Sequence, residues 1–473
     1  MLIPCACSLD KAKQCRKGGR NNMLSVIIPI AVLLILILVK KIPKIGGNVP
    51  IALLITAVLA LVLSKIFNPI DWLLAFVDGL DRIAWVIALA VFGSIYAECQ
   101  NRLGAIGTVM NTFRAMFGHS PKGLVICVIL VLVIGGSLLG GSVAACTVVG
   151  VLMIPSLIEL GLNPVQISAI LLMGGEFGSI MPPITQGLFQ SAALIGIDPN
   201  EAMPLGYITT LIGLVLVCIY VCIFYMKGKK MKEELIPKES AGQILKENWK
   251  SLIPLCLLFV LILLNSLFSI NIIGTIFKPV LTALSGIKII KGISNLTVFT
   301  LIVVTALCFV SPKVHKNAGE LFVTAIKNVR SSILVCGACG LMLGAFYAGG
   351  QIDAIKAFAT SLSPNVMKIG GALAVVLIGM LTGSQTTAQN TIVSFFGPSL
   401  VEVGVQPTHA VIACSNLAAA GQAAPPACII AFVIAGLVGG IVKGEKPDPV
   451  KIMIASLPMI IYNLIIGVLF MYI

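Results

Sequence analysis

The chain has 473 residues, of which 58% are apolar and only 11% are charged. A soluble globular domain carries about 25% charged residues, so most of this surface must face something other than water. The net charge of +14 does not indicate nucleic acid, because Lys and Arg lie in loops that flank apolar runs, as expected of basic cytoplasmic loops. The composition therefore excludes a soluble enzyme or nucleic-acid binder and indicates a membrane protein.

Taken in chain order, the sequence divides into four parts. Residues 1–22 form a polar, basic extension, and Met23 opens the first apolar run, so either Met1 or Met23 is the start. Residues 23–226 and 251–473 hold the apolar runs, and residues 227–250 form a basic linker that we expect in the cytoplasm. The runs lack the two-residue alternation of barrel strands, so we expect an all-α polytopic protein with about twelve transmembrane segments.

One apolar run in the first half is too long for a single crossing. Gly123–Ile158 would give about 54 Å of helix at about 1.5 Å per residue, against roughly 30 Å of hydrocarbon. It also contains two patches of small residues, at 135–137 and 140–142. One crossing followed by a re-entrant hairpin accounts for this length.

The second half repeats this pattern without a gap, 243 positions further on. Pro155, Glu159 and Pro164 match Pro398, Glu402 and Pro407. The match extends forward to two Pro-Pro pairs and back to two Gly-rich patches, namely Pro182-Pro183 and Pro425-Pro426, and Gly140–Ala145 and Gly383–Ala388. Prolines aligned in this way predict two structural repeats, each with a re-entrant helical hairpin and a Pro-Pro-broken helix.

Each Pro-Pro pair removes two backbone donors and frees carbonyl groups one turn earlier. In a membrane such groups are tolerated only where they line protein or a water-filled cavity. Paired breaks at matching positions of two halves are the strongest sequence indication of a transporter binding site near mid-membrane. We therefore expect transport rather than a packing kink. The sequence carries no HExxH, Walker or GxSxG motif, so no enzyme is expected.

Two polar features lie in these apolar runs. Glu176 is the single charge between Leu160 and Ile197, and an intramembrane carboxylate either binds a proton, sodium or a cationic group, or joins a neighbouring helix. The second hairpin tip is richer in amides than the first, so we expect it to hold more of the solute. The candidate substrate-binding residues are Ser142, Thr147, Glu176, Ser384, Gln385, Thr386, Thr387, Asn390, Asn416 and Gln422.

The Gly/Ser patches and Pro-Pro breaks, from Gly135 to Ile197 and from Gly371 to Val442, resemble the large permease subunit of tripartite, binding-protein-dependent (TRAP) transporters, the DctM-like family of the ion transporter superfamily. The resemblance implies inverted repeats, an elevator-type mechanism and symport driven by inward sodium. It also implies sodium sites built from backbone carbonyls at the tips and breaks. Carried over, these residues are Gly140, Gly141, Ser142, Gly178, Ser179, Pro182, Gly383, Ser384, Gly421 and Pro425.

The resemblance implies partners as well as a substrate class. Family members use a small membrane subunit and an extracytoplasmic solute-binding protein, and they take up small organic acids of the carboxylate type. Na+ is the expected coupling ion, and no covalently bound cofactor is expected. Yet the runs near the breaks contain no Arg or Lys. The alternative is a stand-alone ion-coupled permease or Na+/H+ antiporter of the same superfamily.

The basic loops leave the topology open. If Lys227–Lys250 and Lys313–Arg330 are both cytoplasmic, an even number of crossings separates the two segments. Both hairpins then enter the membrane from the same face. The resemblance instead implies hairpins that enter from opposite faces. An extra partial crossing or an interfacial helix in Asn271–Ile290 would reconcile the two.

Overall fold

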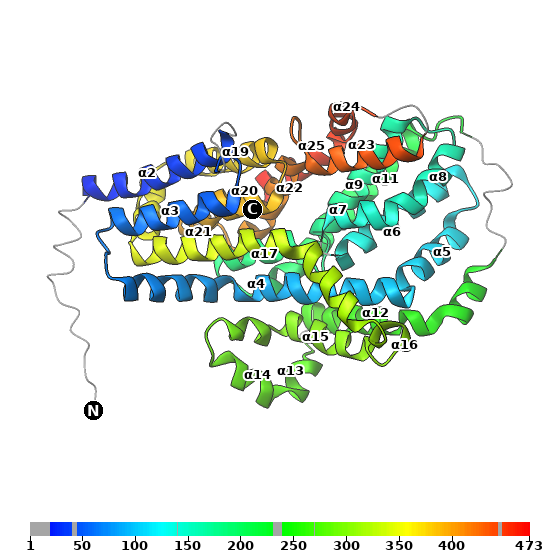
Figure 1. Ribbon diagram of the computed structural model, residues 1–473. Coiled ribbons are helices and arrows are strands. Elements are labelled where there is room, and N and C mark those ends of the chain that lie inside the picture. The colour runs from blue at the N-terminus through cyan, green and yellow to red at the C-terminus, as the bar shows by residue number, and fades with distance from the viewer. Residues whose placement is uncertain (1–18, 40–44, 140, 230–238, 269, 443–446) are drawn as a thin grey trace.

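The computed structural model describes residues 19–39, 45–139, 141–229, 239–268, 270–442 and 447–473. Most of the predicted N-terminal extension and residues 230–238 of the predicted linker lie outside these ranges, as does Gly140. All regular structure in the described residues is helical, without a strand. Figure 1 shows the long helices running roughly side by side in one elongated body. The expected all-α architecture is confirmed.

The helices of the first half follow in chain order. Their bounds are α2 (Gly19–Leu38), α3 (Val49–Leu63), α4 (Pro69–Leu103), α5 (Ala105–Phe117), α6 (Pro121–Leu139), α7 (Ser142–Ala145), the π-helical η1 (Cys146–Gly150), α8 (Val151–Glu159), α9 (Pro164–Ile180), α10 (Gln186–Ile195) and α11 (Pro199–Phe224).

The second half begins beyond the linker. Its bounds are α12 (Ala241–Phe268), α13 (Ile272–Ile276), α14 (Lys278–Ser285), the 3-10 helix η3 (Ile290–Ser294), α15 (Leu296–Cys308), α16 (Pro312–His315), α17 (Ala318–Ala348), α18 (Gln351–Ser361), α19 (Pro364–Thr382), α20 (Gln385–Ala388), the π-helical η4 (Gln389–Val393), α21 (Ser394–Glu402), α22 (Pro407–Ala423), α23 (Ile429–Ile441), α24 (Pro449–Ala455) and α25 (Leu457–Leu469).

The two halves repeat in their helix bounds as they do in sequence. The segments α6, α7, η1, α8 and α9 begin and end at residues that lie 243 positions before the corresponding bounds of α19, α20, η4, α21 and α22. The helices after the breaks, α10 and α23, also begin 243 positions apart. Each Pro-Pro pair lies between a 17-residue helix and a second, shorter one. The predicted breaks are therefore present in both halves.

Close helix crossings repeat too. A Cβ added to Gly136 on α6 would lie 2.6 Å from the Cα of Gly178 on α9, and one added to Gly379 on α19 would lie 2.8 Å from the Cα of Gly421 on α22. Glycine at these four positions lets the backbones approach to a distance that any side chain would prevent. Each hairpin therefore packs directly against the helix that is broken.

Four helices are long and apolar enough to cross a membrane alone, and counting two bent pairs as single spans gives up to six. Five further apolar helices in the described residues have 10–17 residues. These include α9, which stops at a Pro-Pro break, and α23, which begins after the other. The crossings expected from continuous apolar runs are thus partly assembled from shorter helices, because proline and glycine interrupt the backbone ladder.

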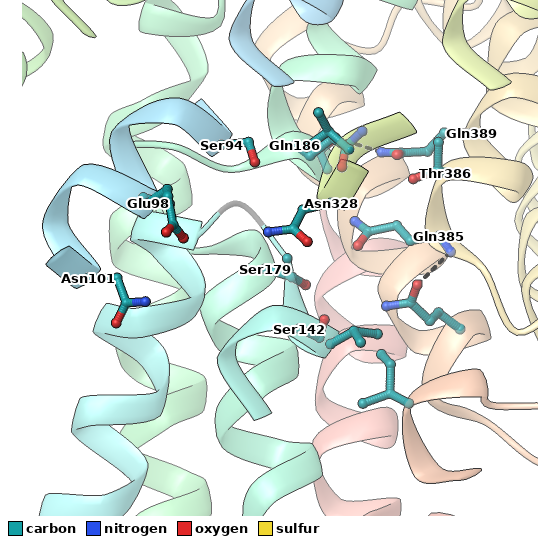
Figure 2. A pocket seen from close by; sticks show the side chains of 17 residues that line it. Ser94, Glu98, Asn101, Ser142, Ser179, Gln186, Asn328, Gln385, Thr386 and Gln389 are labelled. Carbon is teal, nitrogen blue, oxygen red and sulfur yellow. Dashed lines mark hydrogen bonds between the residues drawn. The ribbon is translucent and has the colours of Figure 1, made fainter. Parts of the chain in front are cut away.

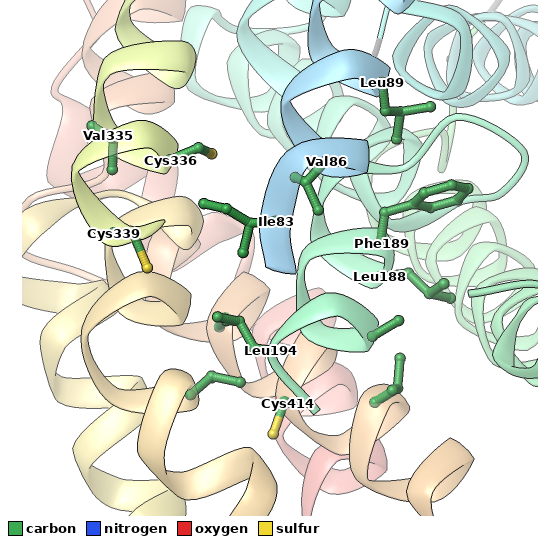
Figure 3. Close-up of a cluster of buried hydrophobic side chains, with 14 of the residues drawn as sticks. Ile83, Val86, Leu89, Leu188, Phe189, Leu194, Val335, Cys336, Cys339 and Cys414 are labelled. Carbon is green, nitrogen blue, oxygen red and sulfur yellow. The ribbon is translucent and has the colours of Figure 1, made fainter. Parts of the chain in front are cut away.

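The long helices α4 and α17 form a pair beside these repeated elements (Figure 1). A Cβ on Gly79 of α4 would lie 2.0 Å from the carbonyl oxygen of Gly340, and one on Gly344 would lie 1.9 Å from that of Ala75. Figure 3 shows α4, α10, α17 and α22 meeting through buried apolar side chains, among them Phe189. The pair therefore contacts the broken helix of the first half through an apolar surface.

The region between α12 and α15 differs from a simple loop. The helix α12 begins at Ala241 and so takes in the last ten residues assigned to the predicted linker. Beyond it, α13 and α14 have only five and eight residues, and neither is long enough to cross a membrane. Ion pairs join this region to α4, from Lys288 to Asp78 and from Lys291 to Asp81. Asp78 raises the pKa of Lys288, so the lysine remains charged.

Candidate functional site

A cavity of about 280 Å³ lies where the hairpin tips, the helix breaks and the α4–α17 pair meet. Figure 2 shows side chains from all of these elements facing it. Its lining consists of Ser94, Ala97, Glu98, Asn101, Gly141, Ser142, Val143, Ser179, Gln186, Gly187, Asn328, Val329, Gln385, Thr386, Gln389, Gln422 and Ile430. Segments from residue 94 to residue 430 thus converge on one polar space.

The first break is held open by side-chain hydrogen bonds. The Thr185 hydroxyl donates to the Ser179 carbonyl oxygen at 2.7 Å and accepts from the Leu188 amide at 3.4 Å. Thr185 is fully buried, and it caps α10 while it satisfies a carbonyl that the interrupted α9 leaves free. The break is therefore an ordered structure with both of its helix ends at the cavity.

Glu176 links the two halves at the cavity wall. Its side chain is fully buried, and both carboxylate oxygens accept from Gln422 Nε2, at 2.9 and 3.0 Å. The Gln422 Oε1 accepts the backbone N–H of Gln385 at 2.8 Å. Because a backbone N–H can only donate, this bond fixes the orientation of the amide and turns its NH₂ toward Glu176. One chain of bonds thus joins the first break, the second break and the second hairpin tip.

The amides of the second hairpin also bind the first half. Gln389 Nε2 donates to the Gly187 carbonyl at 2.6 Å and to the Ser191 hydroxyl at 2.9 Å. Asn390 accepts a hydrogen bond from Gln190. Both Gln389 and Asn390 are fully buried. The amide-rich tip therefore has a structural role in joining the repeats, and part of it also faces the cavity.

The opposite wall carries the one ionisable side chain of the lining. Glu98 of α4 pairs with Arg102 one turn later, with Nε and Oε1 3.0 Å apart. Arg102 also donates to the Asn317 carbonyl at 3.0 Å and lies 3.9 Å from Glu320. Its guanidinium is therefore held outside the lining, and the sixteen lining residues other than Glu98 are neutral.

The predicted site residues separate into two groups. Those that line the cavity are Gly141, Ser142, Ser179, Gln385, Thr386 and Gln422. Those described but outside its lining are Thr147, Glu176, Gly178, Pro182, Gly383, Ser384, Thr387, Asn390, Asn416, Gly421 and Pro425. Gly140 lies outside the described residues. Whether any of these residues binds solute or sodium stays a prediction.

Several residues outside the lining have other contacts. Thr147 donates to the Val143 carbonyl at 2.9 Å, and Asn416 donates to the Ile412 carbonyl at 2.9 Å, each within its own helix. Ser384 accepts from the Thr387 amide at 3.2 Å as the cap of α20. Gly383 has φ +64°, and a Cβ there would lie 1.9 Å from the Ala427 carbonyl oxygen. These four residues lie outside the cavity lining.

Sequence reasoning did not predict the contribution of α4 and α17. Ser94, Glu98 and Asn101 recur at spacings of three and four residues, which places them on one face of α4, and Asn328 faces them from α17. This stripe of polar residues in an otherwise apolar run is visible in the sequence and could have indicated that α4 faces a polar space. Nothing in the sequence paired this stripe with hairpin tips more than forty residues away.

Paired hairpins and broken helices around one polar cavity define a polytopic secondary transporter. The sequence from residue 24 to residue 473 matches the family described as "Tripartite ATP-independent periplasmic transporter, DctM component". The chain belongs to this family, whose members are transporters rather than enzymes and are the large membrane subunits of TRAP systems. In those systems they work with a small membrane subunit and a solute-binding protein.

One curated protein is similar to this chain in sequence, and two solved transporters are similar to it in fold. The chain is 25% identical over 362 residues to "Uncharacterized protein YgiK" of Salmonella typhimurium (strain LT2), covering 75% of this chain and 76% of that one. The fold is similar to that of the Alcanivorax borkumensis YdaH transporter (TM-score 0.58, 12% identity, 95% and 96% of the two chains). It is also similar to that of Neisseria gonorrhoeae MtrF, described among antimetabolite efflux pumps (TM-score 0.57, 14% identity, 95% and 94%).

Proposed function

We propose that this protein is the large permease subunit of a tripartite system in the inner membrane and takes up a small organic acid with sodium. The observation that carries the proposal is the single cavity to which both hairpins, both helix breaks and the α4–α17 pair contribute. Family membership supports the partners, a small membrane subunit and an extracytoplasmic binding protein.

The donor set around the cavity supports sodium as the coupling ion. Hydroxyl and amide oxygens from Ser142, Ser179, Thr386 and Gln422 surround it, and such hard oxygen ligands suit an alkali cation. Interrupted helices add backbone carbonyls of the kind that coordinate Na+ in other secondary transporters. Glu176, bonded to Gln422 at the cavity wall, adds a carboxyl group whose oxygens are of the same hard type.

The arrangement of the contacts supports an elevator-type motion. The hairpins and broken helices are tied to one another by the Glu176–Gln422–Gln385 bonds. Their contact with α4 is largely apolar, as at Phe189 against Trp85, whose ring centroids lie 5.5 Å apart. A unit that is bonded tightly within itself and largely apolar toward its neighbour can slide past it while breaking few hydrogen bonds. Two such bonds toward α17 are weak thiol bonds, from Cys336 to Gln190 and from Cys339 to the Asn390 carbonyl.

Reconstitution in liposomes tests this function. With sodium outside, we expect accumulation of an organic acid that requires the purified binding protein and small subunit and that collapses when the sodium gradient is removed. The same gradient of potassium is the control. Accumulation that ignores sodium would overturn the coupling.

The buried carboxylate of Glu176 favours a second candidate, a stand-alone permease or Na+/H+ antiporter. The same liposome experiment without the binding protein and the small subunit distinguishes a tripartite permease from this alternative. Transport by this chain alone, or sodium-driven movement of protons without solute, would favour the alternative.

A further inference from the structure

The charge and hydrogen-bonding capacity of the cavity indicate what its solute must carry besides a carboxylate. All of the lining residues are among those described, and none of them is Lys, Arg or His. A carboxylate moved from water into such a site gains no counter-charge from these side chains. It would instead approach Glu98, the one charged side chain of the lining, and like charges repel more strongly in a partly desolvated site.

Glu98 has an oxygen available to a cationic group. Its Oε1 binds Arg102, whereas no hydrogen bond or ion pair to Oε2 occurs within the described residues. Arg102 is drawn away from the cavity by Asn317 and Glu320. The Glu98 side chain is only 16% exposed, so a positive group that reaches it meets a carboxylate already shielded from most of the water.

A second, independent acceptor lies across the cavity. Gln389 is fully buried, and its Oε1 has no hydrogen-bond partner. Its orientation is fixed, because Nε2 donates to the carbonyl oxygen of Gly187, which can only accept. An acceptor buried without a donor is destabilising, and a solute N–H in the cavity would satisfy it. Figure 2 shows Glu98 and Gln389 on opposite sides of the cavity.

We propose that the solute bears a protonated amino group as well as its carboxylate, and that Glu98 and Gln389 bind the solute's donor groups. The substrate class is therefore an amino acid or a related zwitterion rather than a simple organic acid. The neutral donors Asn101, Asn328 and Thr386, which share the lining, receive the carboxylate end. This inference rests on the proposed transport function and specifies its solute.

The test uses matched pairs of acids that differ only in the group at carbon 2. Binding to the purified full-length protein is followed by the shift in its melting temperature, in sodium, with L-malate against L-aspartate, L-lactate against L-alanine, and 2-hydroxyglutarate against L-glutamate. We expect the amino member of at least one pair to bind about tenfold more tightly, as a charge-assisted hydrogen bond predicts. Equal or weaker binding by the amino member of every pair would overturn the inference.

Variants separate the charge of Glu98 from its structural role. The double variant Glu98→Gln/Arg102→Gln removes both charges of the ion pair, so the net charge of the pair stays zero. We expect this double variant to abolish the preference for the amino member. Glu320→Gln is the matched control, since Glu320 also faces Arg102 but is 74% exposed and outside the lining; it should keep the preference. A preference that survives in the double variant would contradict the role of Glu98.

The outcome is distinguishable from failure of the transport function itself. Sodium-driven uptake of a hydroxy acid without binding of any amino acid would overturn only this inference. Binding of an amino acid without sodium-driven accumulation would overturn the proposed function and leave the inference standing.

Discussion

At the scale of single residues, Glu176 and Gln422 matter most, because they join halves of the chain that are 246 positions apart. A buried carboxylate needs either a cation or several donors. Here the Gln422 amide donates to both oxygens, and the side chains of Ser142 and Ser179 also hydrogen-bond the carboxyl group. The same amide accepts from the tip of the second hairpin. A change at either residue should therefore affect stability and transport together.

We expect Gln422→Leu to lower the stability of the protein by about 1–3 kcal/mol, since it removes the amide that donates to both oxygens of a buried carboxylate. The melting temperature of the detergent-solubilised protein measures this. The double variant Glu176→Met/Gln422→Leu removes both partners and should recover most of the loss. A double variant that is less stable than Gln422→Leu would show that the pair is not the cause.

We expect Glu176→Gln to reduce sodium-driven uptake and to change its dependence on sodium concentration, because the substitution replaces the carboxyl group that can bind a proton or a cation beside the cavity. The measurement is initial uptake rate against sodium concentration in proteoliposomes. Unchanged uptake with an unchanged sodium dependence would leave Glu176 with only a role in joining helices.

At the scale of elements, each hairpin depends on glycine at one crossing. Gly136 meets Gly178 in the first half, and Gly379 meets Gly421 in the second. These glycines set the separation of α6 from α9 and of α19 from α22, and so set where the tips lie relative to the breaks. The shape of the cavity therefore depends on contacts between helix backbones at these crossings rather than on contacts between side chains.

We expect Gly379→Ala to destabilise the protein by about 1–3 kcal/mol, because the added methyl group forces α19 and α22 apart. Gly370→Ala on the same helix is the control, since a Cβ there meets nothing within 4 Å. It should be neutral or slightly stabilising. Thermal unfolding of the two variants compares them, and equal losses would contradict the crossing argument.

At the scale of the whole molecule, two groups of elements face each other across the cavity. The α4–α17 pair is packed backbone to backbone through Gly79 and Gly344. The hairpins and broken helices form the other group, bonded internally through Gln389 and Gln422. The proposed elevator motion requires these groups to move relative to one another while each stays intact.

We expect a cross-link between the groups to stop transport. Ala97 on α4 and Val143 at the first hairpin tip both line the cavity, and the pair Ala97→Cys/Val143→Cys can be joined by a thiol cross-linker. With a cross-linker that contains a disulfide, uptake should be lost on cross-linking and restored by reduction, and each variant with only one of the two added cysteines should keep its uptake under the same treatment. Uptake that continues in fully cross-linked protein would exclude relative motion at this contact.

The sequence by itself determined the class of fold and the repeat. Low charge and long apolar runs required lipid-facing helices. The prolines 243 positions apart placed both breaks, and the helix bounds around them repeat at the same interval in the structure. The number of transmembrane segments was harder to predict from the sequence, because proline and glycine divide apolar runs into helices shorter than a crossing. These signals are local, so they could be read along the chain.

Only the tertiary structure decided which polar residues share the cavity. Asn390 and Asn416, for which solute binding stays a prediction, lie outside the lining and make helix contacts. Glu98 and Asn328 instead come to the cavity from α4 and α17. Nor does the sequence indicate that Gln422 lies between Glu176 and Gln385. Local pattern fixes where a helix begins and breaks, but the partner of a side chain depends on how distant helices pack.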